Sequence, residues 1–133
     1  MTRSEELAAM LAKADRSLRS ARLLAADGSF DFAASRAYYA AFYAMEAALL
    51  VHNVEAATHT GVIGEFSKLF FKTGILPKEL SKTIGNLFRE RQTGDYEYIF
   101  AISLAEAEAD CAGAEVILAH VRQYLMEQGF LSA

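Results

Sequence analysis

The sequence has little cysteine, which can cross-link a fold through disulfides, and little proline, which interrupts helices. Among its 133 residues there are one cysteine, Cys111, one proline and no tryptophan. A lone cysteine cannot close a disulfide within the chain, so we expect a reducing compartment, the cytoplasm. The three histidines are scattered, and no paired Cys/His spacing, Rossmann motif or P-loop motif occurs. We therefore expect no metal and no cofactor.

The chain also lacks a membrane-spanning segment and a surplus of basic residues. Its longest apolar run, 40–51, contains Glu46 and is far shorter than the roughly 20 residues needed to cross a bilayer. The net charge of −4 counts against coating nucleic acid by bulk electrostatics. Residues 96–133 hold one basic residue against six acids, whereas residues 1–95 hold twelve against eleven. A local basic surface on the first three-quarters of the chain therefore remains open, beside the alternative of ordinary solvated helix faces.

What the sequence does contain is helical periodicity. It is 53% hydrophobic, and apolar residues recur at i, i+3, i+4 and i+7 without sustained strand alternation, which predicts an all-α fold. We expect residues 1–133 to form a single-domain antiparallel bundle of about five helices. The predicted helices cover residues 3–26, 30–53, 62–72, 77–93 and 103–126. The glycines near their ends are interpreted as residues that mark helix ends. Gly94 is expected to end the fourth helix, and Gly61 and Gly64 are interpreted in the same way.

The segment 30–53 is apolar almost all round, which is typical of a helix at the centre of a bundle or at a subunit interface. One strip differs, since its residues fall within about 80° of one another at 100° per residue. It consists of Arg36, Tyr39, Tyr43, Glu46 and Leu50. Aromatic residues and arginine are enriched at interface cores, so Tyr39 and Tyr43 are candidates for a dimer interface. Whether the strip is core, cleft or interface stays open.

Arg91 shares the apolar sector of the predicted fourth helix and should point inward. Because a guanidinium keeps its proton, it must find a carboxylate, a carbonyl, a partner subunit or an anionic ligand. Pairing with Asp95 or with the last helix carbonyls is an equally good interpretation. Gln92, Asp95, Tyr96 and Tyr98 follow it closely.

Three motifs together resemble the small stand-alone prokaryotic proteins of the HEPN superfamily: SRAYYAAFYAMEAALL at 35–50, HTG at 59–61 and R-x4-Y-x-Y at 91–98. The resemblance spans about residues 3–127. It implies an all-α bundle, a homodimer, and a minimal nucleotidyltransferase encoded beside it as a toxin–antitoxin or stress-response pair. It also implies a site, because many members are metal-independent ribonucleases that use an R-x4-6-H motif at the dimer interface.

The motif carries over only in part. Arg91 matches its arginine, and Gln92 is the polar residue common after it, but Tyr96 stands where the histidine is expected. A phenol with a pKa near 10 is a poor base at neutral pH, whereas an imidazole near 6.5 is suited to the task. Tyr98 falls at the position of a tyrosine that the partner nucleotidyltransferase can adenylylate in members with R-x4-H-x-Y.

Three hypotheses follow, and whether the chain is an enzyme stays open. In the first, a non-catalytic or weakly catalytic dimer binds nucleotide, RNA or a nucleotidyltransferase through Arg91, Asp95, Tyr96 and Tyr98, with Arg36 lining the cleft. In the second, the protein is a metal-independent endoribonuclease in which His59 or Tyr96 replaces the missing histidine. In the third, the Arg36, Tyr39 and Tyr43 face is a dimerisation scaffold without a ligand.

Overall fold

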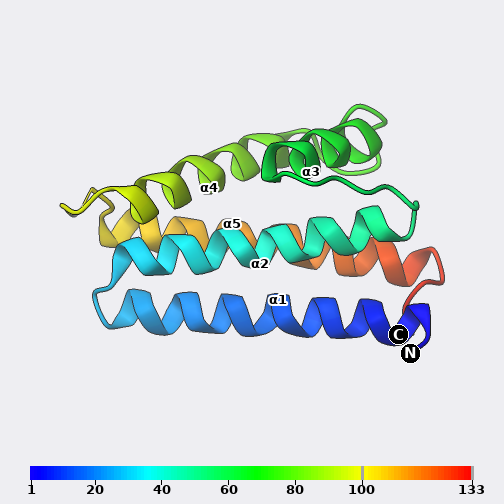
Figure 1. The fold of residues 1–133 in the computed structure, drawn as a ribbon, viewed down its shortest axis with the longest axis horizontal. Helices are drawn as coiled ribbons and strands as arrows, with labels where there is room; N and C mark the ends of the chain where they lie inside the picture. The colour runs from blue at the N-terminus through cyan, green and yellow to red at the C-terminus, as the bar shows by residue number, and fades with distance from the viewer. Residues whose placement is uncertain (100, 133) are drawn as a thin grey trace.

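The computed structural model describes residues 1–99 and 101–132, and all regular structure in these residues is helical, which confirms the all-α prediction. The elements are α1 (Arg3–Ala26), α2 (Phe30–Leu50), α3 (His59–Phe66), the π-helical turn η1 (Ser67–Phe71), α4 (Glu79–Tyr96) and α5 (Leu104–Glu127). Consecutive long helices run antiparallel, so that α2 and α5 point in the same direction, and both termini lie at the same end of the bundle (Figure 1). Phe100, in the predicted loop 95–102, lies outside the described residues. None of the helices in the described segments has the length and apolar content that crossing a membrane requires.

Helix α2 lies at the centre because its side chains are small and apolar. It packs against α1, α5, α4 and α3. Eight of its alanines are fully buried, at positions 33, 34, 37, 40, 41, 44, 47 and 48. Since the distance between packed helices depends on the side chains at the contact, these alanines let the neighbouring helices approach closely. The larger Tyr38 and Met45 fill the remaining core and are also fully buried.

The ends of α2 and α3 differ from the prediction. Helix α2 ends at Leu50 instead of residue 53, because Asn53 adopts a left-handed conformation with φ of 57° and Val54 N–H donates to the carbonyl of Leu49. Helix α3 begins at His59 instead of residue 62, because the Thr58 hydroxyl accepts the Gly61 N–H at 3.0 Å and caps the helix. His59 therefore belongs to a helix and not to the predicted loop, and Gly61 and Gly64 lie inside α3.

The prediction that Gly94 ends the fourth helix is wrong. Helix α4 continues through a buried Gly94 to Tyr96. A Cβ atom at Gly94 would lie 2.6 Å from the carbonyl oxygen of Asp31, in the first turn of α2. This glycine marks a close approach of two helices, which is a second common reason for glycine inside a helix.

Candidate functional site

The predicted strip on α2 is its partly exposed face. Arg36, Tyr39, Tyr43, Glu46 and Leu50 are all half-buried, whereas most of the remaining α2 side chains are buried. On one side, the Lys13 ammonium of α1 lies 4.9 Å from the centre of the Tyr43 ring. On the other side, Tyr39 contacts Arg91 of α4. The strip therefore runs between α1 and α4.

Arg91 points inward from α4, and its side chain is 15% exposed. Its Nη2 donates to the Tyr39 hydroxyl at 3.1 Å, and its Nε lies 2.9 Å from Asp95 Oδ2. Its Cζ atom lies 5.6 Å from the centre of the Tyr38 ring and 5.5 Å from that of Tyr39. Asp95, the intrahelical carboxylate proposed from the sequence, thus holds the guanidinium together with Tyr39 of the α2 strip, a contact that the sequence did not predict.

The fold brings His59 to the same two tyrosines. His59 Nδ1 lies 2.8 Å from the Tyr38 hydroxyl, and its ring centre lies 5.8 Å from that of Tyr39. The ring also stacks on Phe42 at 4.4 Å. We call Tyr38, Tyr39, His59, Arg91 and Asp95 the Arg91 cluster. It draws on α2, α3 and α4, and the Thr58 cap that starts α3 fixes where His59 stands.

The environment sets the protonation of the cluster. Burial, reinforced by the positive charge of Arg91, lowers the pKa of His59, so its imidazole is neutral at pH 7. Burial raises the pKa of Tyr38, against the opposing influence of Arg91, so its phenol keeps its proton. The bond between these two neutral groups can run in either direction, because each can donate or accept. With His59 Nδ1 as donor, Nε2 is left as a free base beside a fixed cation.

The remaining predicted site residues lie around the cluster or away from it. Arg36 Cζ lies 4.8 Å from the centre of the Tyr39 ring, which places a second cation at this end of the strip. Gln92 is exposed on α4. Tyr96 is 71% exposed and Tyr98 is fully exposed. In the described contacts, Arg91 meets Asp95 and the α2 tyrosines and not Tyr96.

Sequence reasoning missed Tyr38 and Lys13. Tyr38 is fully buried, and its sequence context is that of a core residue. It belongs to the site only because its hydroxyl forms a hydrogen bond with His59. Lys13 is exposed on α1 and belongs to the strip through Tyr43 alone. No group of three or more His, Cys, Asp or Glu side chains suitable for a metal occurs in the part of the chain that the structure describes.

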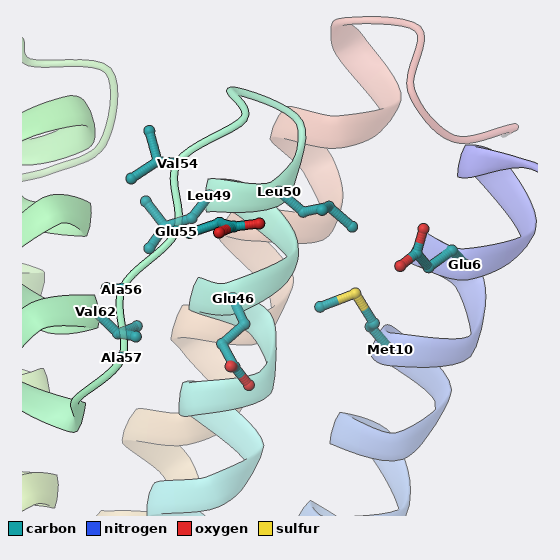
Figure 2. A pocket seen from close by; sticks show the side chains of 10 residues that line it. All are labelled: Glu6, Met10, Glu46, Leu49, Leu50, Val54, Glu55, Ala56, Ala57 and Val62. Carbon is teal, nitrogen blue, oxygen red and sulfur yellow. The ribbon is translucent and has the colours of Figure 1, made fainter.

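The opposite end of the strip is acidic. A groove of about 530 Å³ opens there between α1, α2 and the segment before α3. Figure 2 shows Glu46 from α2, Glu6 from α1 and Glu55 from the connecting segment around it, beside Met10 and Leu50. Burial raises the pKa of Glu46, against the opposing charge of Lys13. Because like charges repel, phosphate is favoured at the Arg36 and Arg91 end of the strip and disfavoured here.

Comparisons with known proteins agree with this architecture. The model of the HEPN domain family matches residues 7–124. The protein named "Putative toxin MJ0142" of Methanocaldococcus jannaschii is 35% identical over 95% of this chain and 86% of its own length. A second protein of that organism, "Putative toxin MJ0605", is 29% identical over 92% of this chain and 91% of its own. The crystal structure of TT1696 from Thermus thermophilus has the same fold, with a TM-score of 0.75 over 92% of this chain and 98% of that one at 22% identity.

Proposed function

The chain belongs to the HEPN domain family, and from this premise we propose that it is a toxin–antitoxin-type protein whose Arg91 cluster binds a phosphate group of RNA or of a nucleotide. Two relatives that align over more than nine-tenths of the chain are named as toxins, which supports this class. The observation that carries the proposal is the setting of Arg91. Its guanidinium is held in place by Tyr39 and Asp95, and the side chain keeps 15% of its surface exposed.

The guanidinium retains binding capacity. Nε faces Asp95 and Nη2 donates to Tyr39, while Nη1 donates no hydrogen bond among the described residues. Its planar N–H groups match the oxygens of a phosphate, and Arg36 adds a second positive charge at the same end of the strip. Asp95 pairs with Arg91 and forms no ion pair with Arg36 among the described residues, which leaves this end of the strip attractive to an anion.

The test compares Arg91→Ala with Arg89→Ala, an exposed arginine on the same helix that bonds Asn86. Binding of AMP and of a labelled ten-nucleotide RNA is measured by fluorescence anisotropy and by thermal shift. We expect R91A to weaken binding by about tenfold or more, as for loss of a charged hydrogen bond, and R89A to change it little. Equal binding by R91A and wild type, or stabilisation by none of these ligands, would favour the scaffold hypothesis.

A second function, metal-independent RNA cleavage, is favoured by the position of His59. In this reaction His59 Nε2 removes the proton of a ribose 2′-hydroxyl and the 2′-oxygen attacks the adjacent phosphorus. The bond to the 5′-oxygen then breaks, giving a 2′,3′-cyclic phosphate and a leaving oxygen that takes up a proton. A neutral His59 with Nδ1 donating to Tyr38 suits the role of base.

Cleavage is assayed in EDTA with the same RNA. His59→Ala should lower the rate by about 100-fold or more with little effect on RNA binding, whereas R91A should lower both. Tyr96→Phe separates the two substitutes for the missing histidine, since its rate should equal that of wild type. Cleavage that survives in H59A would exclude His59 as the base.

We also propose that the protein forms a homodimer through Tyr39 and Tyr43 and that Tyr98 accepts AMP from a minimal nucleotidyltransferase. The Tyr98 phenol is fully exposed, so an enzyme can reach it. Its oxygen would bond to the α-phosphorus of ATP, with release of pyrophosphate and the phenolic proton. Incubation with the nucleotidyltransferase encoded beside it and ATP should add the mass of AMP to wild type and to Y96F but not to Tyr98→Phe.

A further inference from the structure

The lysines of this protein are gathered in one short part of the chain. Four of the five, at positions 68, 72, 78 and 82, lie between η1 and the first turns of α4. Residues 67–82 contain one acid, Glu79. A local surplus of positive charge in a protein of net charge −4 marks this region as distinct from the rest of the surface.

Two of these lysines line a cavity. It has a volume of about 440 Å³ and is lined by Ser67, Phe71, Lys72, Lys78 and Ser81. In the described residues, neither Lys72 nor Lys78 forms an ion pair, whereas Lys68 pairs with Glu65 at 3.6 Å. The polar lining thus consists of two uncompensated ammonium groups and two hydroxyls, the donors that an anion requires.

The backbone adds to this preference. Helix α4 starts at this cavity without a capping side chain. The N–H groups of Leu80 and Ser81 donate to the carbonyls of Pro77 and Lys78 in a tight first turn. These two N–H groups are therefore not free to bind a ligand, and the 18-residue helix contributes only the positive end of its dipole, which lies at residues that line the cavity. The helix end adds to the positive potential of the site, and the two lysines and two hydroxyls supply the groups that would contact an anion.

We propose that this cavity binds a phosphate group of an RNA backbone, as a second anion subsite apart from the Arg91 cluster. The choice of RNA rests on the proposed function, whereas the choice of phosphate rests on the cavity alone. Lysine is a compact charge on a flexible stem that accepts phosphate in many orientations. The cavity would hold the backbone without reading sequence.

The two subsites lie at opposite ends of the α3–η1 segment and at opposite ends of α4. Helix α3 starts at His59, in the Arg91 cluster, and continues through η1 to Phe71, at the lysine cavity. Helix α4 begins near Lys78 and Ser81 at the cavity, carries Arg91 near its other end and packs on α2 and α5; Figure 1 shows it running back along the bundle from the end at which α3 lies. The α-helical part from His59 to Phe66 rises by about 10 Å, and the π-helical turn η1 adds its own length up to Phe71. A mononucleotide cannot span that distance, but an RNA of several nucleotides can.

The experiment compares two double variants that remove the same charge. K72Q/K78Q changes the lysines of the cavity, and K68Q/K82Q changes their neighbours, which do not line it. For a ten-nucleotide RNA at about 0.1 M salt, we expect K72Q/K78Q to bind about tenfold more weakly, with a salt slope lower by about one to two. K68Q/K82Q should lose much less, and AMP binding should be unchanged in both. Equal loss of RNA binding in the two doubles would overturn the cavity in favour of a diffuse positive field.

A second experiment distinguishes failure of the lysine cavity from failure of the proposed function of Arg91. Inorganic tripolyphosphate is titrated against wild type, R91A and K72Q/K78Q, with binding followed by calorimetry. The cavity predicts a lysine-dependent binding event that R91A retains and K72Q/K78Q loses, while any tripolyphosphate bound at the Arg91 cluster stays bound in K72Q/K78Q. No tripolyphosphate binding by wild type would overturn the cavity, while absence of AMP binding with tripolyphosphate binding intact would overturn the Arg91 proposal alone. Stronger lysine-dependent binding to phosphatidylserine vesicles than to RNA would overturn the choice of RNA.

Discussion

Gly94 controls how closely α4 approaches α2. The position is buried, and an added Cβ would lie 2.6 Å from the carbonyl oxygen of Asp31 and 3.2 Å from its carbonyl carbon. Backbone atoms cannot rotate away as a side chain does, so a methyl group here must push the helices apart. Arg91 and Asp95 flank Gly94 on the same helix, so this packing also sets how deeply the guanidinium reaches toward Tyr39.

We predict that Gly94→Ala lowers the free energy of unfolding by about 1–3 kcal/mol, because overpacking outweighs the better helix propensity of alanine. The matched control is Gly64→Ala in α3, where nothing lies within 4 Å of the added Cβ. That change should raise the free energy of unfolding by up to about 1 kcal/mol. Urea denaturation measures both. If G94A were as stable as wild type or more stable, α4 would be able to move away from α2 at no cost in free energy, which would contradict the prediction.

The same residues show how far the sequence could predict the site. The helical wheel placed Arg91 inward and grouped the five strip residues of α2 on one face, because both follow from the period of a single helix. Gly94 was misinterpreted because a terminal glycine and a glycine at a helix contact look alike in sequence. The approach of His59 to Tyr38 depends on how α3 packs on α2, and nothing in the spacing of residues 59 and 91 encodes it.

Among the helix pairs, α4 and α5 hold a buried acid pair. Asp110 of α5 is 4% exposed, and its carboxyl faces that of Glu90 of α4, so that a proton shared between them would form a hydrogen bond. The buried oxygens Glu90 Oε1 and Asp110 Oδ2 have no hydrogen-bond partner among the described residues as long as both carboxyl groups are ionised. A bond between two carboxyl groups needs a proton on one of them. Burial, the bond to Glu90, and the charges of Glu90 and Glu106 raise the pKa of Asp110 from 3.8 to about 9.

This pair predicts that the protein loses stability as the pH rises. Between about pH 4 and pH 9 the folded protein holds a proton that the unfolded chain releases, so the free energy of unfolding falls through this range and levels off above it. Asp110→Asn keeps a neutral hydrogen-bonding group and removes the titration. At pH 8 it should be more stable than wild type by about 1–3 kcal/mol, and the advantage should vanish near pH 4.

Chemical denaturation at several pH values between 4 and 9 provides the measurement. Glu108→Gln, an exposed acid on the same helix, removes one charge without touching the pair and should follow the wild-type curve. A wild-type stability that is flat across this range, or a D110N variant less stable than wild type at pH 8, would contradict a shared proton.

Element by element, the sequence predicted the helices better than their ends. The apolar stripes located α1 and α5 within about a residue, because their caps, Thr2 and Ser103, have recognisable side chains. The end of α2 depends on the left-handed Asn53, which competes with continued helix. The start of α3 depends on the Thr58 cap. The HTG sequence that follows does not indicate a helix start, because its threonine and glycine are also common in turns.

At the scale of the whole molecule, the α2 strip has opposite charges at its two ends. Arg36 and Arg91 lie at one end, and Glu46 lies toward the acidic groove at the other, with Tyr39 and Tyr43 between them. In a two-fold dimer whose axis passes through Tyr39 and Tyr43, the same surface meets itself in reverse, so the cationic end of one protomer would point toward the acidic end of its partner without covering the Arg91 cluster. The strip is thus self-complementary, with an aromatic centre suited to an interface core.

We predict that the protein sediments at twice its chain mass of 14.6 kDa and that Tyr43→Glu shifts it to the mass of one chain. The added carboxylate lies one turn from Glu46 and in the aromatic centre, where like charges and desolvation oppose association. Tyr43 is half-buried, so circular dichroism should show an intact helical fold. The control Tyr98→Glu adds the same charge outside the strip and should leave the dimer unchanged.

Analytical ultracentrifugation at rising salt completes the test, because charge pairing across the ends predicts a weaker wild-type dimer at higher ionic strength. A wild type that stays monomeric at about 100 μM, or a Y43E dimer as tight as wild type, would place any interface on another face of the bundle.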